Sequence, residues 1–409
     1  MPINLKFHDI KLPYSIHCAF PAAILATCLV ILAVVSLQRH APLLPVPVVT
    51  SRADGRSGGN HSCNIFDGEW VPDPAPPPYT TETCPVIHGH YDCMRYGRPD
   101  LGFIRWRWRP AGCELPRFDA ARFLGAMRGK SMAFVGDSLA RNQMHSLVCL
   151  LTAAEQPAPR TNASHVYRFE RHGFTVASFW SPFLVRAVET DPDGPTRSGS
   201  GLWSLHLDEP DAGWAAHAGD FDYVVVSAGS WFFRPSVFHE RGRLVGCNGC
   251  LAPNVTDLTL RYSLRAAFRS ALRAAVGARG AGRRRRTVVV RTLSPSHYEN
   301  GTWNEDADCA RTRPLRRGEW EMNAVEKEMY AIQREEFAAA EAAARREGDG
   351  ARMLLLDATE AMALRPDAHP SRYRLWQPDR FNVTRDCLHW CLPGAMDACN
   401  DMLLHMLLG

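Results

Sequence analysis

A serine that follows a short apolar run is the first residue of this sequence whose surroundings suggest chemistry. The run Met132–Val135 leads into Gly136 and Asp137, and Ser138 comes next, ahead of a stretch with a helical pattern. Glycine permits a sharp turn from strand to helix, and free N–H groups at a helix start can stabilise a developing oxyanion. Ser138 is therefore a candidate nucleophile. The alternative is that Gly-Asp-Ser only caps a helix.

A carboxylate and an imidazole lie close together near the carboxyl end of the chain. Asp386 and His389 are three positions apart, so one helical turn would place both on one side. A carboxylate bonded to one ring nitrogen leaves the other free to take the proton of Ser138. Zinc binding by Cys387, His389 and Cys391 is a rival interpretation, but Cys-x-His-x-Cys is not a common zinc spacing, and we expect no metal. A purely structural histidine is the other alternative.

Strand and helix patterns alternate after residue 118, and they indicate how these residues are positioned. Strands are expected at Met132–Val135, Tyr223–Val226, Thr287–Arg291 and Met353–Leu356. Helices are expected at Leu139–Leu151, Leu258–Val276 and Glu319–Arg346. Such alternation predicts a largely parallel sheet covered on both faces. Open sheets of this class bind ligands at the carboxyl ends of their strands, where Ser138 would lie.

The composition is that of a globular protein without a strongly charged partner. The chain has 409 residues, of which 46% are hydrophobic, and 47 basic against 43 acidic residues leave a formal charge of +4. This balance argues against a nucleic-acid partner. The basic run Arg283–Arg286 is interpreted as a solvated loop. The length allows one large core, or one core with a smaller accessory module.

The first 61 residues are predicted to hold a membrane anchor. Cys18–Leu37 contains no charged residue and is about long enough to span a bilayer as a helix. Residues 1–17 would then form a cytosolic tail, and residues 38–61, rich in Pro, Gly, Ser and Arg, a flexible stem. A cleaved signal peptide is the competing interpretation.

The rest of the chain is predicted to face an oxidising, glycosylating lumen. Eleven of the thirteen cysteines follow the apolar segment, which favours disulfides. Residues 62–117 form a block rich in cysteine and proline that is too short to build its own core. Potential N-glycosylation sites occur at Asn60, Asn162, Asn254, Asn300 and Asn382.

Several longer motifs between Cys63 and Leu408 resemble the trichome-birefringence-like family of plant polysaccharide O-acetyltransferases. In chain order they read CNIFDGEWVPD, CPVIHGHYDCMRYGRPD, WRWRPAGCELPRFD, FVGDSLARNQ and DCLHWCLPG. The resemblance implies a GDSL/SGNH-like, three-layer α/β/α catalytic domain with a mainly parallel sheet over residues 118–409. It implies that Ser138 is the nucleophile, His389 the base and Asp386 the residue that orients the base. GCNGC and RTLSPSHYENGTW look most like the branch that acetylates xyloglucan and mannan.

The resemblance also implies which residues surround the triad. The Ser138 N–H, with donors from the turn around Gly229, would form an oxyanion hole. Many members read Asn-x-Gly-His-Trp-Trp at this turn, whereas this chain has Ser227 and Ser230 in the asparagine and histidine positions. The Ser227 hydroxyl would still be able to donate a hydrogen bond. The motif residues expected to line the site are Gly136, Asp137, Arg141 and Asn142.

Disulfide pairs follow from the same resemblance. The expected pairs are Cys63–Cys113, Cys84–Cys149, Cys93–Cys391 and Cys309–Cys387, with Cys247 and Cys250 able to pair locally. Two of these pairs would tie the loop that carries His389 to distant segments. Cys399 is left without a partner.

The implied reaction is a double displacement without a bound cofactor. Ser138 would take an acetyl group from acetyl-CoA or an acetylated intermediate. A hydroxyl of a cell-wall polysaccharide, xyloglucan or mannan, would then accept it with His389 as base. The expected location is the Golgi membrane, with a single span in type II orientation and a lumenal catalytic domain. An acetyl esterase and a non-catalytic wall-polysaccharide binder are the alternatives. Candidates for stacking on sugars are Trp106, Trp108, Trp231 and Trp390.

Overall fold

The computed structural model describes residues 63–158, 165–195, 201–278, 285–302, 307–346, 351–375 and 385–408. The predicted tail, anchor and stem, and the sequons at Asn60, Asn162 and Asn382, lie outside these residues. Within the described ranges, no helix combines the length and the apolar character needed to cross a bilayer. The two remaining sequon asparagines, Asn254 and Asn300, are both exposed.

Strands and helices alternate through most of the described chain. The strands are β1 (Gly68–Pro72), β2 (Trp106–Pro110), β3 (Ser131–Gly136), β4 (Val166–Phe169), β5 (Phe174–Trp180), β6 (Val185–Asp191), β7 (Leu202–Pro210), β8 (Tyr223–Ser227), β9 (Ser236–Glu240), β10 (Arg243–Asn248), β11 (Thr287–Arg291) and β12 (Arg352–Leu356). The helices are α2 (Ala120–Ala126), α3 (Ser138–Leu151), α4 (Ala212–Ala215), α5 (Thr259–Gly277), α6 (Ala324–Arg346), α7 (Thr359–Ala363) and α8 (Ala395–Leu408).

A six-stranded sheet forms the centre of the fold. Its order is β12-β11-β8-β3-β5-β4, and all neighbouring strands pair parallel except β4, which runs antiparallel to β5 at the edge. The four predicted strands correspond to β3, β8, β11 and β12, so the predicted parallel sheet is confirmed, with one antiparallel edge strand added. The direction of chain progression reverses between β3 and β8, and such switch points are where open α/β sheets bind ligands.

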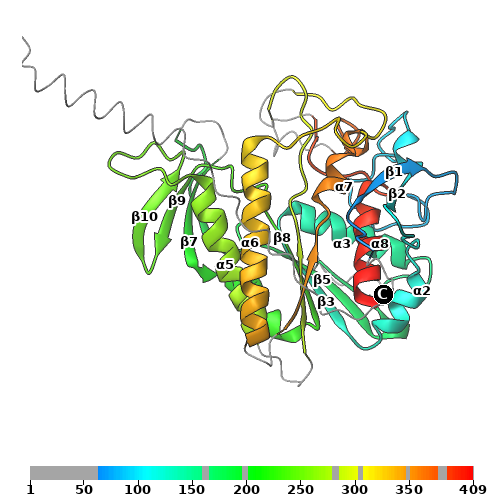
Figure 1. Cartoon of the computed structure of the whole chain (residues 1–409), viewed down its shortest axis with the longest axis horizontal. Helices are drawn as coiled ribbons and strands as arrows, with labels where there is room; N and C mark the ends of the chain where they lie inside the picture. The colour runs from blue at the N-terminus through cyan, green and yellow to red at the C-terminus, as the bar shows by residue number, and fades with distance from the viewer. Residues whose placement is uncertain are drawn as a thin grey trace, which may run out of the picture. The chain divides into compact units, whose positions relative to one another are not determined.

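Helices cover both faces of this sheet, as the alternation predicted. Strand side chains that point to one face, such as Val225 and Val289, belong to the core that contains α3 and α8. Their neighbours, such as Val224 and Val288, belong to the core that contains α5 and α6. Figure 1 shows α5 and α6 on one side of the sheet and α3 and α8 on the other. Burial on both faces explains why these strands are continuous apolar runs.

The longest predicted helix begins later than expected. The sequence predicted a start at Glu319, whereas α6 begins at Ala324. The reason is a capping box: the Glu326 N–H donates to Asn323 Oδ1 (2.9 Å), and the Asn323 N–H donates to Glu326 Oε2 (3.1 Å). Reciprocal bonds of this kind satisfy donors that a helix start leaves free.

A second sheet was not predicted. Its four strands are ordered β10-β9-β7-β6, and Figure 1 shows β7, β9 and β10 beside α5, away from α3 and α8. The Trp203 ring on β7 packs among Phe183 and Trp231, at ring-centroid distances of 5.4 and 5.6 Å. The second sheet therefore contacts the segment after β8 that contains Trp231.

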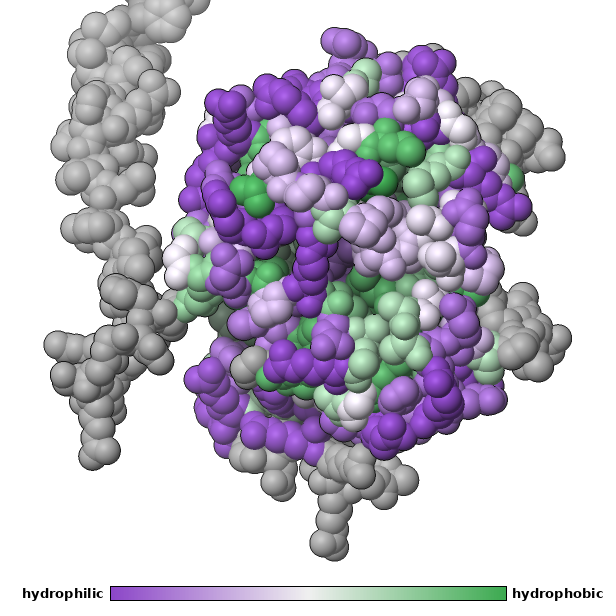
Figure 2. Space-filling view, turned by 90° about the vertical axis from the view of Figure 1, so that its right-hand side faces the viewer, coloured by the Kyte–Doolittle hydropathy of each residue, from purple (hydrophilic) through white to green (hydrophobic). Residues whose placement is uncertain are grey.

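The cysteine-rich N-terminal block shares the core of the catalytic domain. β1 and β2 pair antiparallel, and Trp70 and Trp108 pack in the same cluster as residues of α3 and α8. The prediction that this block cannot build its own core is consistent with this packing. Figure 2 views the molecule from the side on which β1, β2 and α2 lie in Figure 1. On this side, hydrophobic residues lie in separate patches between hydrophilic ones.

The expected disulfides are all present. They join Cys63 to Cys113, Cys84 to Cys149, Cys93 to Cys391, Cys247 to Cys250 and Cys309 to Cys387. Cys399 is a buried free thiol, and burial raises its pKa to about 11. Because Cys387 and Cys391 are disulfide-bonded, neither offers a thiolate to zinc, and the zinc interpretation of this segment is wrong.

Candidate active site

The turn between β3 and α3 requires glycine at its first position. Gly136 has a φ of +147°, and a Cβ built on it would lie 1.8 Å from the carbonyl oxygen of Ser227. The next residue continues this close approach, because the Asp137 N–H donates to the same oxygen (3.2 Å). Gly136 therefore lets β3 and β8 come together at the switch point, and its role is to shape the turn.

The Asp137 carboxylate connects the nucleophile turn to the loop after β8. Its Oδ1 accepts from the Leu139 N–H (3.0 Å) and so caps α3. Its Oδ2 accepts from the Gly229 N–H (3.1 Å) and from the Ser230 N–H and Oγ (3.2 and 2.7 Å). Ser230 thus helps to hold the turn through this carboxylate.

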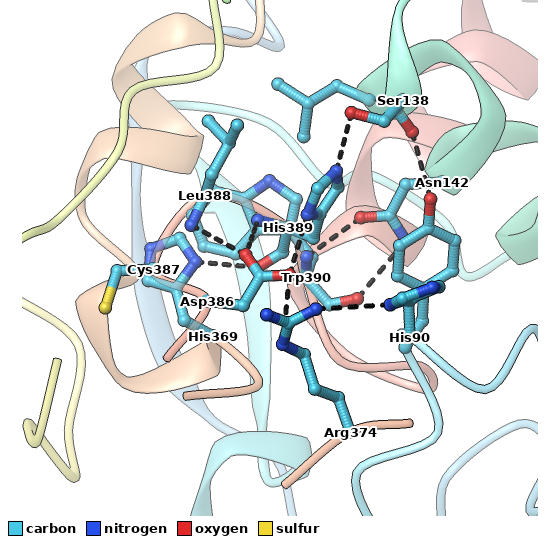
Figure 3. A network of polar contacts seen from close by, with 12 residues as sticks. His90, Ser138, Asn142, His369, Arg374, Asp386, Cys387, Leu388, His389 and Trp390 are labelled. Atoms are coloured by element: carbon cyan, nitrogen blue, oxygen red, sulfur yellow. Dashed lines mark hydrogen bonds and ion pairs between the residues drawn. The ribbon is translucent and has the colours of Figure 1, made fainter. Parts of the chain in front are cut away.

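The three predicted triad residues lie together, as Figure 3 shows. Ser138 Oγ lies 2.6 Å from His389 Nε2, and His389 Nδ1 lies 2.8 Å from Asp386 Oδ2. With the Nδ1 hydrogen directed at the carboxylate, Nε2 is left to accept from the serine hydroxyl. Asp386 Oδ1 also accepts from the Leu388 and His389 N–H groups, at 3.1 and 3.0 Å. The geometry fits a nucleophile, a base and the carboxylate that orients the base.

Positive charge behind the triad keeps Asp386 ionised. Burial acts to raise the pKa of this carboxyl, but His389 and Arg374 outweigh it and hold the pKa well below its ordinary value. Arg374 Nε lies 3.9 Å from Asp386 Oδ2, and Arg374 Nη1 lies 3.2 Å from His90 Nδ1 (Figure 3). An ionised Asp386 can stabilise the imidazolium that forms when His389 takes a proton.

Asn142 holds the histidine loop and does not line the site, so that expectation is wrong. Its side chain is completely buried. Asn142 Oδ1 accepts from the Trp390 N–H (2.8 Å), and Asn142 Nδ2 donates to the Trp390 carbonyl (3.2 Å). Both ends of the amide are used by the residue that follows His389. Trp390 is itself fully buried, which rules it out as a sugar-stacking residue.

Two buried histidines support the same loop from behind. His369 Nδ1 lies 2.7 Å from the carbonyl oxygen of His389, and its Nε2 lies 2.7 Å from His297 Nδ1. The His369 ring stacks on Trp390 with centroids 4.1 Å apart. The base is therefore fixed by contacts to its side chain, to its carbonyl and to its neighbour in the chain.

The N-terminal block contributes to the site, which the sequence reasoning missed. The Tyr91 hydroxyl donates to the carbonyl oxygen of Ser138 (3.2 Å), and the Tyr91 ring lies 5.5 Å from the His389 ring. The carbonyl of Tyr91 accepts from the Leu392 N–H (2.8 Å). A signal was present, since the expected pair Cys93–Cys391 places the segment that contains Tyr91 next to the histidine loop.

The turn after β8 differs from what the resemblance implied. The Gly229 N–H donates to Asp137, so this donor is already used and the expectation that it serves an oxyanion hole is wrong. The Ser227 side chain is buried, and its Oγ accepts from Arg291 Nη2 (2.6 Å). The Ser138 N–H, at the start of α3, remains the expected oxyanion donor.

Two expectations about the site remain: the position of Arg141 and the absence of a metal-binding group. Arg141 lies one helical turn after Ser138, and its guanidinium carbon lies 5.6 Å from the centroid of the Trp180 ring. Across the residues that the structure describes, no group of three or more His, Cys, Asp or Glu side chains is arranged to hold a metal ion.

Fold and site together define a class of protein. Ser138 at its strand-to-helix turn and the Asp386–His389 segment both lie within residues 115–406. These residues match the family model described as the "GDSL/SGNH-like Acyl-Esterase family found in Pmr5 and Cas1p". Residues 61–114 match the "PMR5 N terminal Domain".

Full-length relatives narrow this class to one family. The chain is 47% identical to protein trichome birefringence-like 19 of Arabidopsis thaliana, over 85% of this chain and 81% of the relative. It is 40% identical to xyloglucan O-acetyltransferase 4 of Populus trichocarpa (84% and 81%). It is 39% identical to xyloglucan O-acetyltransferase 1 of Arabidopsis thaliana (84% and 80%). The chain belongs to the trichome-birefringence-like family, which confirms the resemblance.

Proposed function

We propose that this protein is an O-acetyltransferase that acetylates hydroxyls of a plant cell-wall polysaccharide, with xyloglucan as the first candidate acceptor and mannan as the second. The observation that carries the proposal is the 2.6 Å contact between Ser138 Oγ and His389 Nε2, with Asp386 on the other ring nitrogen. The choice of acceptor is supported by the two relatives named as xyloglucan O-acetyltransferases.

In the first half of the reaction, the serine takes the acetyl group. His389 Nε2 accepts the hydroxyl proton while Ser138 Oγ attacks the acetyl carbonyl carbon. The negative charge that forms on the carbonyl oxygen is stabilised by the Ser138 N–H at the positive end of α3. As the bond to the donor's leaving group breaks, His389 returns the proton to that group. Acetyl-CoA, whose leaving group is a thiol, and an acetylated intermediate are both suitable donors.

In the second half, a sugar hydroxyl takes the place of the leaving group. His389 removes its proton, the sugar oxygen attacks the ester carbonyl of acetyl-Ser138, and Ser138 recovers the proton as it departs. Water can react in the same way, which would make the protein an esterase. Transfer therefore requires that the acceptor occupy the position from which water would attack.

The cellular setting belongs to the same proposal. We place the catalytic part in the lumen of the Golgi apparatus, anchored by Cys18–Leu37. The five disulfides support an oxidising compartment, and the exposure of Asn254 and Asn300 leaves both sequons accessible to glycosylation. Confocal imaging of a fluorescent fusion, with and without Cys18–Leu37, tests the location.

The activity is tested by giving the purified full chain acetyl-CoA and xyloglucan, glucomannan or xylan oligomers. We expect acetylated oligomers, detected by mass spectrometry, and Ser138→Ala should abolish the product while leaving the circular dichroism spectrum unchanged. Ser131→Ala is a matched control because Ser131 begins the same strand, β3, at the end away from the site. Free acetate without acetylated oligomer would establish the esterase instead, and a fully active Ser138→Ala protein would refute the nucleophile.

A further inference from the structure

Two tryptophans meet across the end of β3, beside the nucleophile turn. Trp180 ends β5 and is paired in register with Gly136, while Trp231 follows β8 on the other side of β3. Their rings are 5.2 Å apart between centroids, at an interplanar angle of 82°. β5 and β8 flank β3 in the sheet, so contact between these rings places them at the carboxyl edge, next to Ser138.

A neighbouring residue connects each ring to the nucleophile turn. The guanidinium of Arg141, one turn after Ser138 on α3, lies over the Trp180 ring at 5.6 Å. Trp231 directly follows Ser230, whose N–H and hydroxyl both donate to Asp137. A ligand lying on this pair would therefore extend directly from the reacting serine.

The two tryptophans differ in how far other side chains cover their rings. One face of Trp231 is covered by Arg234, whose guanidinium carbon lies 3.6 Å from the ring centroid, and Trp203 packs against it edge-on. Trp180 remains 47% exposed. An exposed indole ring offers a large apolar surface whose burial against a ligand is favourable. Trp231 thus serves as a support, and Trp180 presents a ring to a ligand.

The chemistry of this surface matches a sugar ring. One face of a pyranose consists of C–H groups and packs flat on an indole, while its hydroxyls at the rim need donors and acceptors. Arg141, whose guanidinium lies over the Trp180 ring, has an Nε–H without a hydrogen-bond partner among the described residues and can donate to such a hydroxyl. By contrast, Trp108 is 2% exposed and donates its Nε1–H to the Ile65 carbonyl (2.8 Å), so it is a core residue and cannot stack on a glycan.

We propose that Trp180, supported by Trp231, stacks on a sugar ring of the acceptor polysaccharide and so determines which residue of that chain presents its hydroxyl to Ser138. The inference rests on the proposed acetyl transfer, since it assigns the acceptor to this side of the site. Trp180 is then a specificity-determining residue that contacts the substrate next to the reacting atoms.

Equilibrium binding in a catalytically inactive protein tests this assignment apart from turnover. In full-length Ser138→Ala protein, we expect Trp180→Ala to weaken binding of a xyloglucan oligosaccharide about tenfold by calorimetry, and Trp180→Phe to recover part of the loss. In the protein with Ser138 intact, Trp180→Ala should raise the KM for the oligosaccharide and leave the KM for acetyl-CoA unchanged. Leu244→Ala is the control, because Leu244 is similarly exposed (50%) but lies on β10.

Three outcomes would overturn the inference. Unchanged oligosaccharide affinity in Trp180→Ala is one, and loss of affinity for acetyl-CoA in place of the oligosaccharide is another, because it would make this a donor surface. The third is a Ser138→Ala protein that binds no xyloglucan, mannan or xylan oligomer. If the oligosaccharide binds through Trp180 but the intact protein acetylates none of these oligomers, the proposed function fails while the binding surface stands.

Discussion

At the scale of single residues, the site separates side chains that react from side chains that hold them. Ser138 Oγ lies 2.6 Å from His389 Nε2, as proton transfer between them requires. The polar side-chain atoms of Asp137 and Asn142 are instead bonded to backbone groups of neighbouring segments. All four residues belong to short motifs, and the sequence alone does not show which of them react and which hold the site together. Only the hydrogen-bond partners distinguish them, since a buried polar group must be paired within the protein.

Asn142→Ala tests this separation. The two bonds to the Trp390 backbone disappear, each worth about 1 kcal/mol, and the loop that carries His389 loses its attachment to α3. Because a barrier change of about 1.4 kcal/mol corresponds to a factor of ten in rate, we expect kcat for acetyl transfer to fall roughly 10- to 100-fold. Steady-state kinetics should show little change in acceptor KM. A variant with raised KM and normal kcat would show instead that Asn142 contacts the substrate.

At the scale of elements, the N-terminal block and the histidine loop behave as one unit. Tyr91 contacts both Ser138 and His389, and two residues later Cys93 is bonded to Cys391, across a sequence separation of 298. The block therefore positions the base in addition to covering the core. A disulfide that closes so long a loop also restricts the unfolded chain strongly.

We expect the double variant Cys93→Ala/Cys391→Ala to lose both stability and activity. The free energy of unfolding should fall by about 2–5 kcal/mol, measured by urea denaturation. At temperatures where the protein remains folded, kcat should still be reduced, because the His389 loop is less restrained. Cys247→Ala/Cys250→Ala is the control, since this pair closes a separation of only 3 between β10 and the turn that follows it and should leave kcat unchanged. Equal losses in both variants would contradict the positioning role.

The elements predicted from sequence were those whose pattern did not depend on distant partners. The centre of β11, Val288–Val290, is a continuous apolar run because both faces of this strand are buried. β6 (Val185–Asp191) exposes most of its residues, so its composition resembles a loop and its pairing depends on β7. For the site, the motifs together with the family resemblance indicated Ser138, Asp386 and His389. Arg374 and His369 lie outside the motifs and come close to these residues only through the fold.

At the scale of the whole molecule, buried imidazoles make stability depend on pH. Burial lowers the pKa of His145 on α3 well below its ordinary value. Below about pH 6.5 the unfolded chain binds a proton at this residue and the folded chain does not, so stability falls as pH falls. Burial lowers the pKa to about 4 at three other histidines, which add to the same trend: His88, His90 and His297. Burial raises the pKa of Asp397 to about 6, which opposes the trend between about pH 4 and 6.

His145→Phe isolates one contribution. A phenyl ring cannot be protonated, and it suits the aromatic surroundings of His145. The centroid of the His145 ring lies 5.9 Å from that of Tyr167 and 5.7 Å from that of His88. We expect the decrease in Tm between pH 7.5 and pH 5 to be smaller in His145→Phe than in the unmodified protein. His217→Phe is the comparison, because the His217 side chain is 58% exposed and meets water in both states. An unchanged pH dependence in His145→Phe would show that this imidazole is charged in the folded protein.

The distance along the chain between Ser138 and His389, 251 positions, has a consequence for biosynthesis. While the ribosome is still making the middle of the protein, the nucleophile is already translated and its proton acceptor does not yet exist. Cys93 must likewise wait, as a free thiol open to premature cross-links, until Cys391 emerges. The Ser138–His389 contact and the Cys93–Cys391 bond can thus form only after the segment that carries His389 and Cys391 has been translated.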